Sequence, residues 1–113
     1  MHELRYASSI IAVLEREVAA AERLTPIVVN IRLSLFSHVT PERLNATLQV
    51  MLEDKDFADV RLHIIPSPFT VRCKRCGHHY EETAYTAECR SCKNTDLDID
   101  KGLEFCIDSF EIQ

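Results

Sequence analysis

The sequence predicts an α+β fold, in which a small mixed three-stranded sheet carries two helices on one face and a smaller module is inserted before the last strand. Two segments repeat apolar residues at helical spacing, and three segments alternate apolar and polar residues at strand spacing. Two Cys-x-x-Cys pairs stand between the second and third alternating segments. The 113 residues suffice for one domain with such an insertion.

A first helix is expected over residues 3–22, because apolar residues recur there at three- and four-residue steps. This stripe comprises Leu4, Ala7, Ile10, Ile11, Leu14, Val18 and Ala21. Thr25 and Pro26 end the helix. A first strand follows over residues 27–35, with a buried face of Ile27, Val29, Ile31, Leu33 and Leu35 and a polar face of Asn30, Arg32 and Ser34.

A second helix is expected to begin after Thr40, which has the residue type of an N-cap. Pro41 fits the first helical position, and Glu42 complements the positive start of the helix. The helix ends near residues 54–56. Its buried stripe comprises Leu44, Leu48, Met51 and Leu52, and Val39 is placed to pack on Leu44 as a hydrophobic staple.

Two further strands complete the sheet. The second covers residues 60–64 and is expected to lie parallel to the first, because a helix connects them. The third begins near Leu103 and changes phase near Asp108 and Ser109, which predicts a β-bulge. We therefore expect a discontinuous α+β domain from residues 1–68 and 101–113. Residues 69–100 form the inserted domain, too small to bury a useful core, so a metal must substitute for packing.

The inserted module contains the motif CKRCGHHYEETAYTAECRSC, with twelve residues between the two cysteine pairs. Two facing pairs place four sulfurs at the corners of a tetrahedron, which favours structural zinc in a zinc-ribbon-like module. The predicted ligands are Cys73, Cys76, Cys89 and Cys92. Gly77 supplies a positive φ after the first pair, and Asn94 tolerates one after the second. Two disulfides, a redox-active pair or an iron–sulfur site are the alternatives.

Composition narrows the classes of function. The net charge is 13 − 18 = −5, which argues against nucleic acid as the main partner. No apolar run approaches the roughly 20 residues of a membrane span. The N-terminus lacks a signal-peptide core, so we expect a cytoplasmic protein. Four cysteines then serve as ligands, and Cys106 is interpreted as an inert strand thiol.

The N-terminal residues Met1, His2 and Glu3 form a second candidate metal site. A large second residue disfavours removal of the initiator methionine. The amine of Met1 and the amide nitrogen and Nδ1 of His2 then close adjacent chelate rings on one ion, with Glu3 or water as a fourth donor. Nitrogen donors in a plane suit Ni(II) or Cu(II) and not zinc. The alternative is an ordinary helix start with a histidine at position 2.

His78 and His79 are interpreted as exposed loop residues, with supplementary ligation as their alternative.

These features together resemble the HypA/HybF family of hydrogenase nickel-incorporation proteins. The resemblance covers the whole chain: the opening MHEL, the cysteine pairs CKRC and CRSC, and the closing GLEFCIDSFEI. Arg5 and Tyr6 after the opening and Phe105 and Cys106 near the end depart from the family pattern and indicate a divergent member.

The resemblance implies a nickel metallochaperone, not an enzyme, that carries Ni²⁺ as transient cargo and holds structural Zn²⁺. It implies delivery to the large-subunit precursor of NiFe hydrogenase and cooperation with a GTPase of the HypB type. Met1, His2 and Glu3 match the family's nickel motif, and the four paired cysteines match its zinc ligands. The exposed sheet edges allow a monomer or a weak homodimer.

Another class of function remains open at this point. A zinc-ribbon adaptor would dock on a hydrogenase-related partner without carrying metal, with Phe69, Tyr80 and Tyr85 as an apolar contact surface. An enzyme is disfavoured, because the sequence has no nucleophile–base pattern and only two glycines for a phosphate loop.

Overall fold

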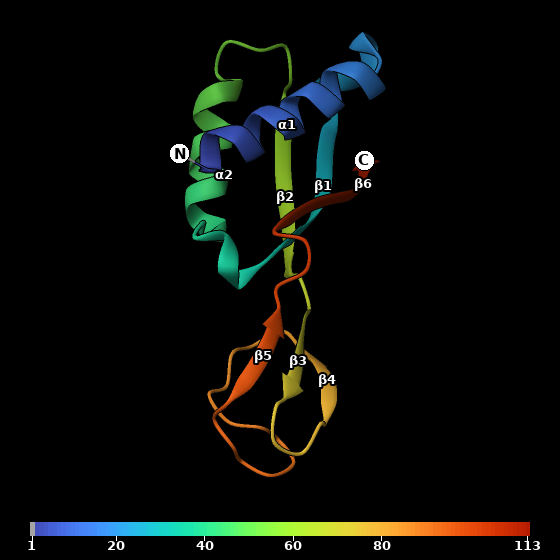
Figure 1. Ribbon diagram of the computed structural model, residues 1–113. Helices are drawn as coiled ribbons and strands as arrows, with labels where there is room; N and C mark the ends of the chain where they lie inside the picture. Colours follow the sequence, from blue (N-terminus) through green and yellow to red (C-terminus); the bar gives the residue numbers. More distant parts are fainter. Residues whose placement is uncertain (1) are drawn as a thin grey trace.

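The computed structural model describes residues 2–113 (Figure 1). Two helices, α1 (His2–Glu17) and α2 (Pro41–Leu52), accompany a sheet of β1 (Pro26–Leu33), β2 (Asp59–Pro66) and β6 (Phe105–Ile112). A second sheet comprises β3 (Phe69–Cys73), β4 (His79–Glu82) and β5 (Leu97–Asp100). Short 3₁₀ turns cover Ala20–Leu24 and Leu35–Ser37. The molecule is elongated, with extents of 56 × 24 × 17 Å.

The first sheet has the mixed topology that the sequence predicts. Its strand order is β2-β1-β6, with β2 parallel and β6 antiparallel to the central β1. Asn30 lies opposite Ser109 and Ile31 lies opposite Ile107, so Asp108 is the extra residue of a bulge. The predicted phase change in the last strand is therefore confirmed.

Both helices cover the same face of this sheet (Figure 1). The face of β1 toward them is buried along its length and comprises Ile27, Val29, Ile31 and Leu33. The opposite face is polar and is tied across the strands. The Nδ2 of Asn30 donates to the Oγ of Ser109 at 2.9 Å, and the Nε of Arg32 donates to Asp108 at 2.8 Å. The sheet thus has one apolar and one polar face, as the alternation predicts.

The end of the first strand differs from the prediction. The strand stops at Leu33, and the chain turns into the 3₁₀ segment Leu35–Ser37. Ser34 is buried, and its Oγ accepts a hydrogen bond from the N–H of Phe36 at 3.0 Å. Ser34 therefore starts the turn and does not belong to the polar face, while Leu35 is 46% exposed and not part of the core.

The first helix ends earlier than residue 22. The α-helix stops at Glu17, and Ala19 has the extended conformation φ −63°, ψ 147° before a separate 3₁₀ turn. Arg23 folds back on the helix end: its Nε donates to the carbonyl of Val18 at 3.2 Å and its Nη2 to that of Glu15 at 2.9 Å. Carbonyls at a helix end lack intrahelical partners, so a side chain from the 3₁₀ turn that follows the helix fixes this terminus.

The buried stripe of α1 also needs correction at both ends. Leu4 is 40% exposed, and Ala21 lies beyond the helix and is exposed. Tyr6, which the apolar spacing omits, is 4% exposed and belongs to the core. The middle of the stripe, from Ala7 to Leu14, is buried as predicted.

The second helix agrees with its predicted start. The Oγ1 of Thr40 accepts a hydrogen bond from the N–H of Arg43 at 3.2 Å, and Pro41 is the first helical residue. Leu44, Leu48 and Leu52 are buried, and Met51 is partly buried. The helix ends at Leu52, two residues before the predicted stop.

The inserted module has a small core of its own. Its buried members are Phe69, Val71, Cys73, Tyr80 and Cys89, so two of the five are cysteines of the paired motif. Phe36 reaches into this cluster from the turn after β1, and its ring meets that of Phe69 edge to face at 5.1 Å. Packing in the module therefore depends on the cysteines and on a residue of the first sheet's turn.

Across residues 2–113, the structure has no helix with the length and apolar character to cross a membrane.

The contact of Arg23 with the end of α1 gives a stability prediction. Replacement by alanine in Arg23→Ala removes two carbonyl bonds and the pairing with Asp56, and we expect the free energy of unfolding to fall by about 2 kcal/mol in urea titrations. The matched control is Arg16→Ala, because the ion pair of Arg16 within residues 2–113 is with its exposed neighbour Glu17 at 3.1 Å. This replacement should cost at most about 0.5 kcal/mol. Equal losses in the two variants would contradict this account of the helix end.

Candidate metal centre

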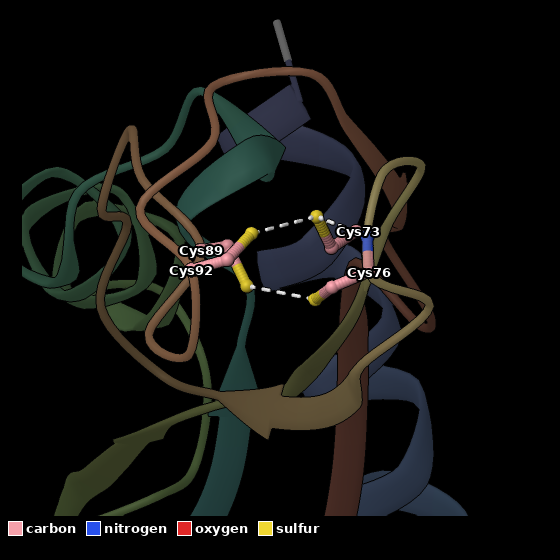
Figure 2. Close-up of side chains that lie close together, drawn as sticks. All are labelled: Cys73, Cys76, Cys89 and Cys92. Atoms are coloured by element: carbon pink, nitrogen blue, oxygen red, sulfur yellow. Dashed lines mark hydrogen bonds between the residues drawn. The ribbon is translucent and has the colours of Figure 1, made fainter.

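The four paired cysteines meet at the far end of the inserted module. Cys73 ends β3, Cys76 lies in the following turn, and Cys89 and Cys92 lie in a second turn before β5. Their four sulfurs lie within 4.8 Å of one another. Figure 2 shows the two pairs facing each other, with the sulfurs turned toward the space between them. Within residues 2–113, no histidine or carboxylate joins this group.

The sulfur geometry fits a tetrahedral metal. The Sγ atoms of Cys73 and Cys92 are 3.6 Å apart, and those of Cys76 and Cys89 are 3.7 Å apart. A tetrahedron with metal–sulfur bonds of about 2.3 Å has edges of about 3.8 Å. A disulfide requires about 2.05 Å, and all four cysteines are free thiols here. The arrangement favours the metal interpretation over two disulfides.

The two cysteine turns have the same backbone design. The N–H of Gly77 donates to the carbonyl of Cys73, and the N–H of Lys93 donates to the carbonyl of Cys89, both at 2.9 Å. Gly77 has φ +77° and Lys93 has φ +64°. The positive φ of the second turn is therefore at Lys93, and the prediction that Asn94 adopts it is wrong. The residue directly after each second cysteine closes the turn.

Asn94 has a different role in the second turn. Its carbonyl accepts the N–H of Cys89 at 2.8 Å, as the carbonyl of His78 accepts the N–H of Cys73 in the first turn. Its Nδ2 also lies 3.8 Å from the sulfur of Cys73 and donates toward it. Asn94 thus links the second turn to a sulfur of the first.

Backbone N–H groups stabilise negative charge on the sulfurs. The N–H of Cys76 donates to the sulfur of Cys73 at 3.4 Å, and this bond is the main cause that lowers the pKa of Cys73 to about 6. Backbone bonds from Cys92 and Ser91 likewise lower the pKa of Cys89. A backbone bond from His78 acts to lower the pKa of Cys76, but burial and the neighbouring thiols raise it to about 12. Backbone donors therefore favour the thiolate form of Cys73 and Cys89. The raised pKa of Cys76 means that its thiol stays protonated at neutral pH unless a cation binds.

The aromatic residues near the cysteines do not form the contact surface considered from the sequence. Phe69 is 2% and Tyr80 is 8% exposed, and only Tyr85 is open, at 56%. The guanidinium of Arg90 lies 4.3 Å from the centre of the Tyr80 ring and closes over it. The rings of Phe69 and Tyr80 therefore belong to the core of the module. His78 and His79 are exposed and lie outside the sulfur group, as expected from the sequence.

The second candidate site, at the N-terminus, is separate from the cysteines. Met1 lies outside the described residues, so its predicted role stays a prediction. His2 and Glu3 occupy the first turn of α1, which Figure 1 places beside α2 and away from the inserted module. The imidazole of His2 is exposed and lies 6.3 Å, ring centre to ring centre, from Tyr6. The pKa of Glu3 is lowered, first by a backbone hydrogen bond and further by nearby positive charge, including Arg43.

A closed four-sulfur centre in an inserted module, joined to an α+β body with a His-Glu helix start, is typical of a metal-handling accessory protein and not of a metalloenzyme with an open coordination position. Known proteins agree with this class. The family model described as "Hydrogenase/urease nickel incorporation, metallochaperone, hypA" matches residues 1–112. The chain therefore belongs to the HypA family of nickel-incorporation metallochaperones, whose role is to supply a metal and not to catalyse a reaction.

Individual relatives support this assignment over their whole length. The hydrogenase maturation factor HypA of Desulfosudis oleivorans is 30% identical over 114 residues, covering 100% of this chain and 99% of the relative. That of Solidesulfovibrio magneticus is 31% identical over 117 residues, covering 100% of both. The solution structure of the Ni metallochaperone HypA from Helicobacter pylori shares the fold, with a TM-score of 0.57, 24% identity and coverage of 99% of this chain and 97% of that one.

The conformation of Lys93 gives a prediction for metal retention. A side chain at positive φ costs roughly 1 kcal/mol, so Lys93→Gly should slow release of the cysteine-bound metal to a chelator about fivefold. The matched control is Arg75→Gly, which removes one positive charge from the other turn, at a residue without positive φ. Release should not slow in Arg75→Gly. Equal slowing in the two variants would show that the lost charge, and not backbone strain, sets retention, and no slowing in Lys93→Gly would refute the role of strain.

Proposed function

We propose that this chain carries Ni(II) at its N-terminus and delivers it to the large-subunit precursor of NiFe hydrogenase, in cooperation with a GTPase of the HypB type. The observation that carries the proposal is the family match over residues 1–112, in a chain whose exposed His2 and neighbouring Glu3 begin a helix. The relatives named as hydrogenase maturation factors support a hydrogenase client.

The proposed nickel ligands are the amine of Met1, the amide nitrogen and Nδ1 of His2, and a fourth donor from Glu3. The first N–H groups of a helix have no intrahelical acceptor, so metal binding at the amide of His2 breaks no bond of α1. Deprotonated amide, amine and imidazole nitrogens in a plane are donors that Ni(II) accepts. The proposed site thus uses the exposed imidazole of His2 and a backbone amide that no intrahelical bond requires.

The helix start also explains why such a site would release its cargo. The positive end of the helix macrodipole opposes a bound cation, and Glu3 offsets part of that charge. Binding requires loss of protons from the amine, amide and imidazole, so nickel affinity falls as the pH falls. A carrier needs this combination of accessible faces and sensitivity to its surroundings.

We propose that Cys73, Cys76, Cys89 and Cys92 hold zinc in a structural role. Zinc bound by all four sulfurs has no open position, so it supplies charge neutralisation and crosslinking to the module and no hydrolytic chemistry.

We further propose that residues 69–100 form one folding unit and residues 1–68 with 101–113 form the other. Four reduced thiols suit a cytoplasmic, reducing compartment.

A docking role is the second candidate, favoured by an apolar groove between the two helices. Its volume is about 340 Å³, and its lining comprises Leu4, Ala46, Thr47, Val50 and Met51. Val50 is 63% exposed there and Leu4 is 40% exposed, so the groove presents apolar side chains of both helices to solvent. The groove lies next to the start of α1 and suits contact with a maturation partner. An adaptor without cargo would use this surface and ignore His2.

Nickel titration of the untagged, zinc-loaded protein by calorimetry and absorbance tests the carrier proposal. We expect about one Ni(II) per chain with a planar-type d–d band, and loss of both in His2→Ala. A variant with two residues added before Met1 should fail in the same way, because its amine is displaced from the imidazole.

The control for this titration is His63→Ala, which removes an exposed histidine from the open face of the sheet. It should bind nickel like the unaltered protein. Binding that persists in both His2→Ala and the extended chain would refute the N-terminal site, and a protein that binds no nickel at all would favour the adaptor.

A further inference from the structure

The ring of Tyr6 occupies a position between the proposed nickel ligand His2 and the segment that returns from the inserted module. His2 and Tyr6 are four residues apart in α1, so their side chains lie on the same face of the helix. Helical side chains point back toward the N-terminus, which brings the Tyr6 ring under the first turn. The two ring centres are 6.3 Å apart, and the ring planes differ by 26°.

Contacts on its other sides hold the Tyr6 ring in place. Phe105 stacks on it with ring centres 4.3 Å apart and planes within 7°. The Tyr6 hydroxyl donates to Oε2 of Glu104 at 3.1 Å, and the guanidinium of Arg5 lies 5.6 Å from the ring centre. Tyr6 is 4% exposed, whereas His2 is exposed. A ring held by these contacts therefore lies beside an exposed imidazole.

The hydroxyl of Tyr6 is a donor at neutral pH, because a phenol ionises only at about pH 10. Its acceptor is the carboxylate of Glu104. Nearly parallel aromatic rings attract each other when their centres are within about 7 Å. A leucine or methionine at position 6 would fill the same core space without offering a ring face to the imidazole.

Glu104 connects Tyr6 to the junction between the two sheets. The carbonyl of Glu104 accepts the N–H of Ser34 at 2.8 Å, in the turn after β1. The preceding residue, Leu103, lies toward the module. Its carbonyl accepts a hydrogen bond from the hydroxyl of Ser67 at 3.1 Å. The N–H of Ser67 in turn donates to the carbonyl of Leu33 at 3.0 Å. Both linkers of the inserted module therefore meet where the Tyr6 hydroxyl is bound.

We propose that Tyr6 is a positioning residue for the nickel ligand His2: its ring orients the imidazole, and its hydroxyl bond to Glu104 anchors that orientation to the junction of the inserted module. The inference rests on the proposed nickel function. It assigns Tyr6 no metal contact. The ring limits the rotamers of His2 before nickel arrives, so less conformational entropy is lost when nickel binds.

The first test is an NMR measurement on the zinc-loaded, nickel-free protein. The face of the Tyr6 ring should shift the imidazole proton signals of His2 upfield. Tyr6→Leu should return those signals to the positions of a free histidine, and Tyr6→Phe, which keeps the ring, should retain the shift. Unchanged His2 signals in Tyr6→Leu would overturn the proposal, whether or not the protein binds nickel.

The second test is nickel titration of the same variants. Loss of an aromatic pair predicts an affinity about threefold to tenfold weaker in Tyr6→Leu. Tyr6→Phe should restore affinity to within about twofold of the unaltered protein. A purely structural role would lower stability in Tyr6→Leu without changing the His2 signals, and the amide signals of β1 report whether the fold persists.

The anchoring part of the proposal has its own measurement. His2→Ala should shift the amide signals of Ser34 and Glu104 when Tyr6 is present and leave them unchanged in a Tyr6→Phe background. Glu104→Gln keeps a carbonyl oxygen for the hydroxyl and should behave like the unaltered protein. Equal shifts with and without the hydroxyl would refute the anchor. Failure of nickel to bind the unaltered protein would refute the carrier function alone.

Discussion

The requirement to bring four sulfurs to one point determines the architecture of the inserted module. All four lie within 4.8 Å of one another, and two of them belong to the module's five buried core residues. Their turns repeat one hydrogen-bond pattern, in which backbone N–H groups donate to sulfur and lower the pKa of Cys73 and Cys89. Thiolates held this close together repel one another, so a bound cation would stabilise the module.

The two candidate metal sites differ in the way that structural and cargo sites should differ. The cysteine site offers four sulfurs, which would fill the coordination shell of a tetrahedral metal and leave no open position. The N-terminal site has backbone atoms and one exposed imidazole at a helix start, where the macrodipole opposes a cation. Under the proposed function, the protein would retain one metal while it releases another. The hydrogen bonds at Ser34, Ser67 and Glu104 join the linkers between the two regions.

Local patterns in the sequence were sufficient for the sheet, the second helix and the cysteine cluster. Alternation in β1 defined its buried face, Thr40 and Pro41 marked the start of α2, and the phase change after Ile107 revealed the bulge. The end of α1 was not predictable in this way, because Arg23 fixes it through contacts from outside the helix. Tyr6 was missed because its burial depends on Phe105 and Glu104, about a hundred residues away. The position of Lys93 was available from the sequence, since it corresponds to Gly77 when the two cysteine turns are aligned.

X-ray absorption at the nickel and zinc edges of the protein loaded with both metals tests the central claim most directly. The account predicts nickel surrounded by nitrogen and oxygen only, with the outer-shell scattering of one imidazole, and zinc surrounded by four sulfurs in the same sample. Sulfur in the first shell of nickel, or a zinc that loses sulfur when nickel is added, would show that the cysteines also bind the cargo and would contradict the separation of the two sites.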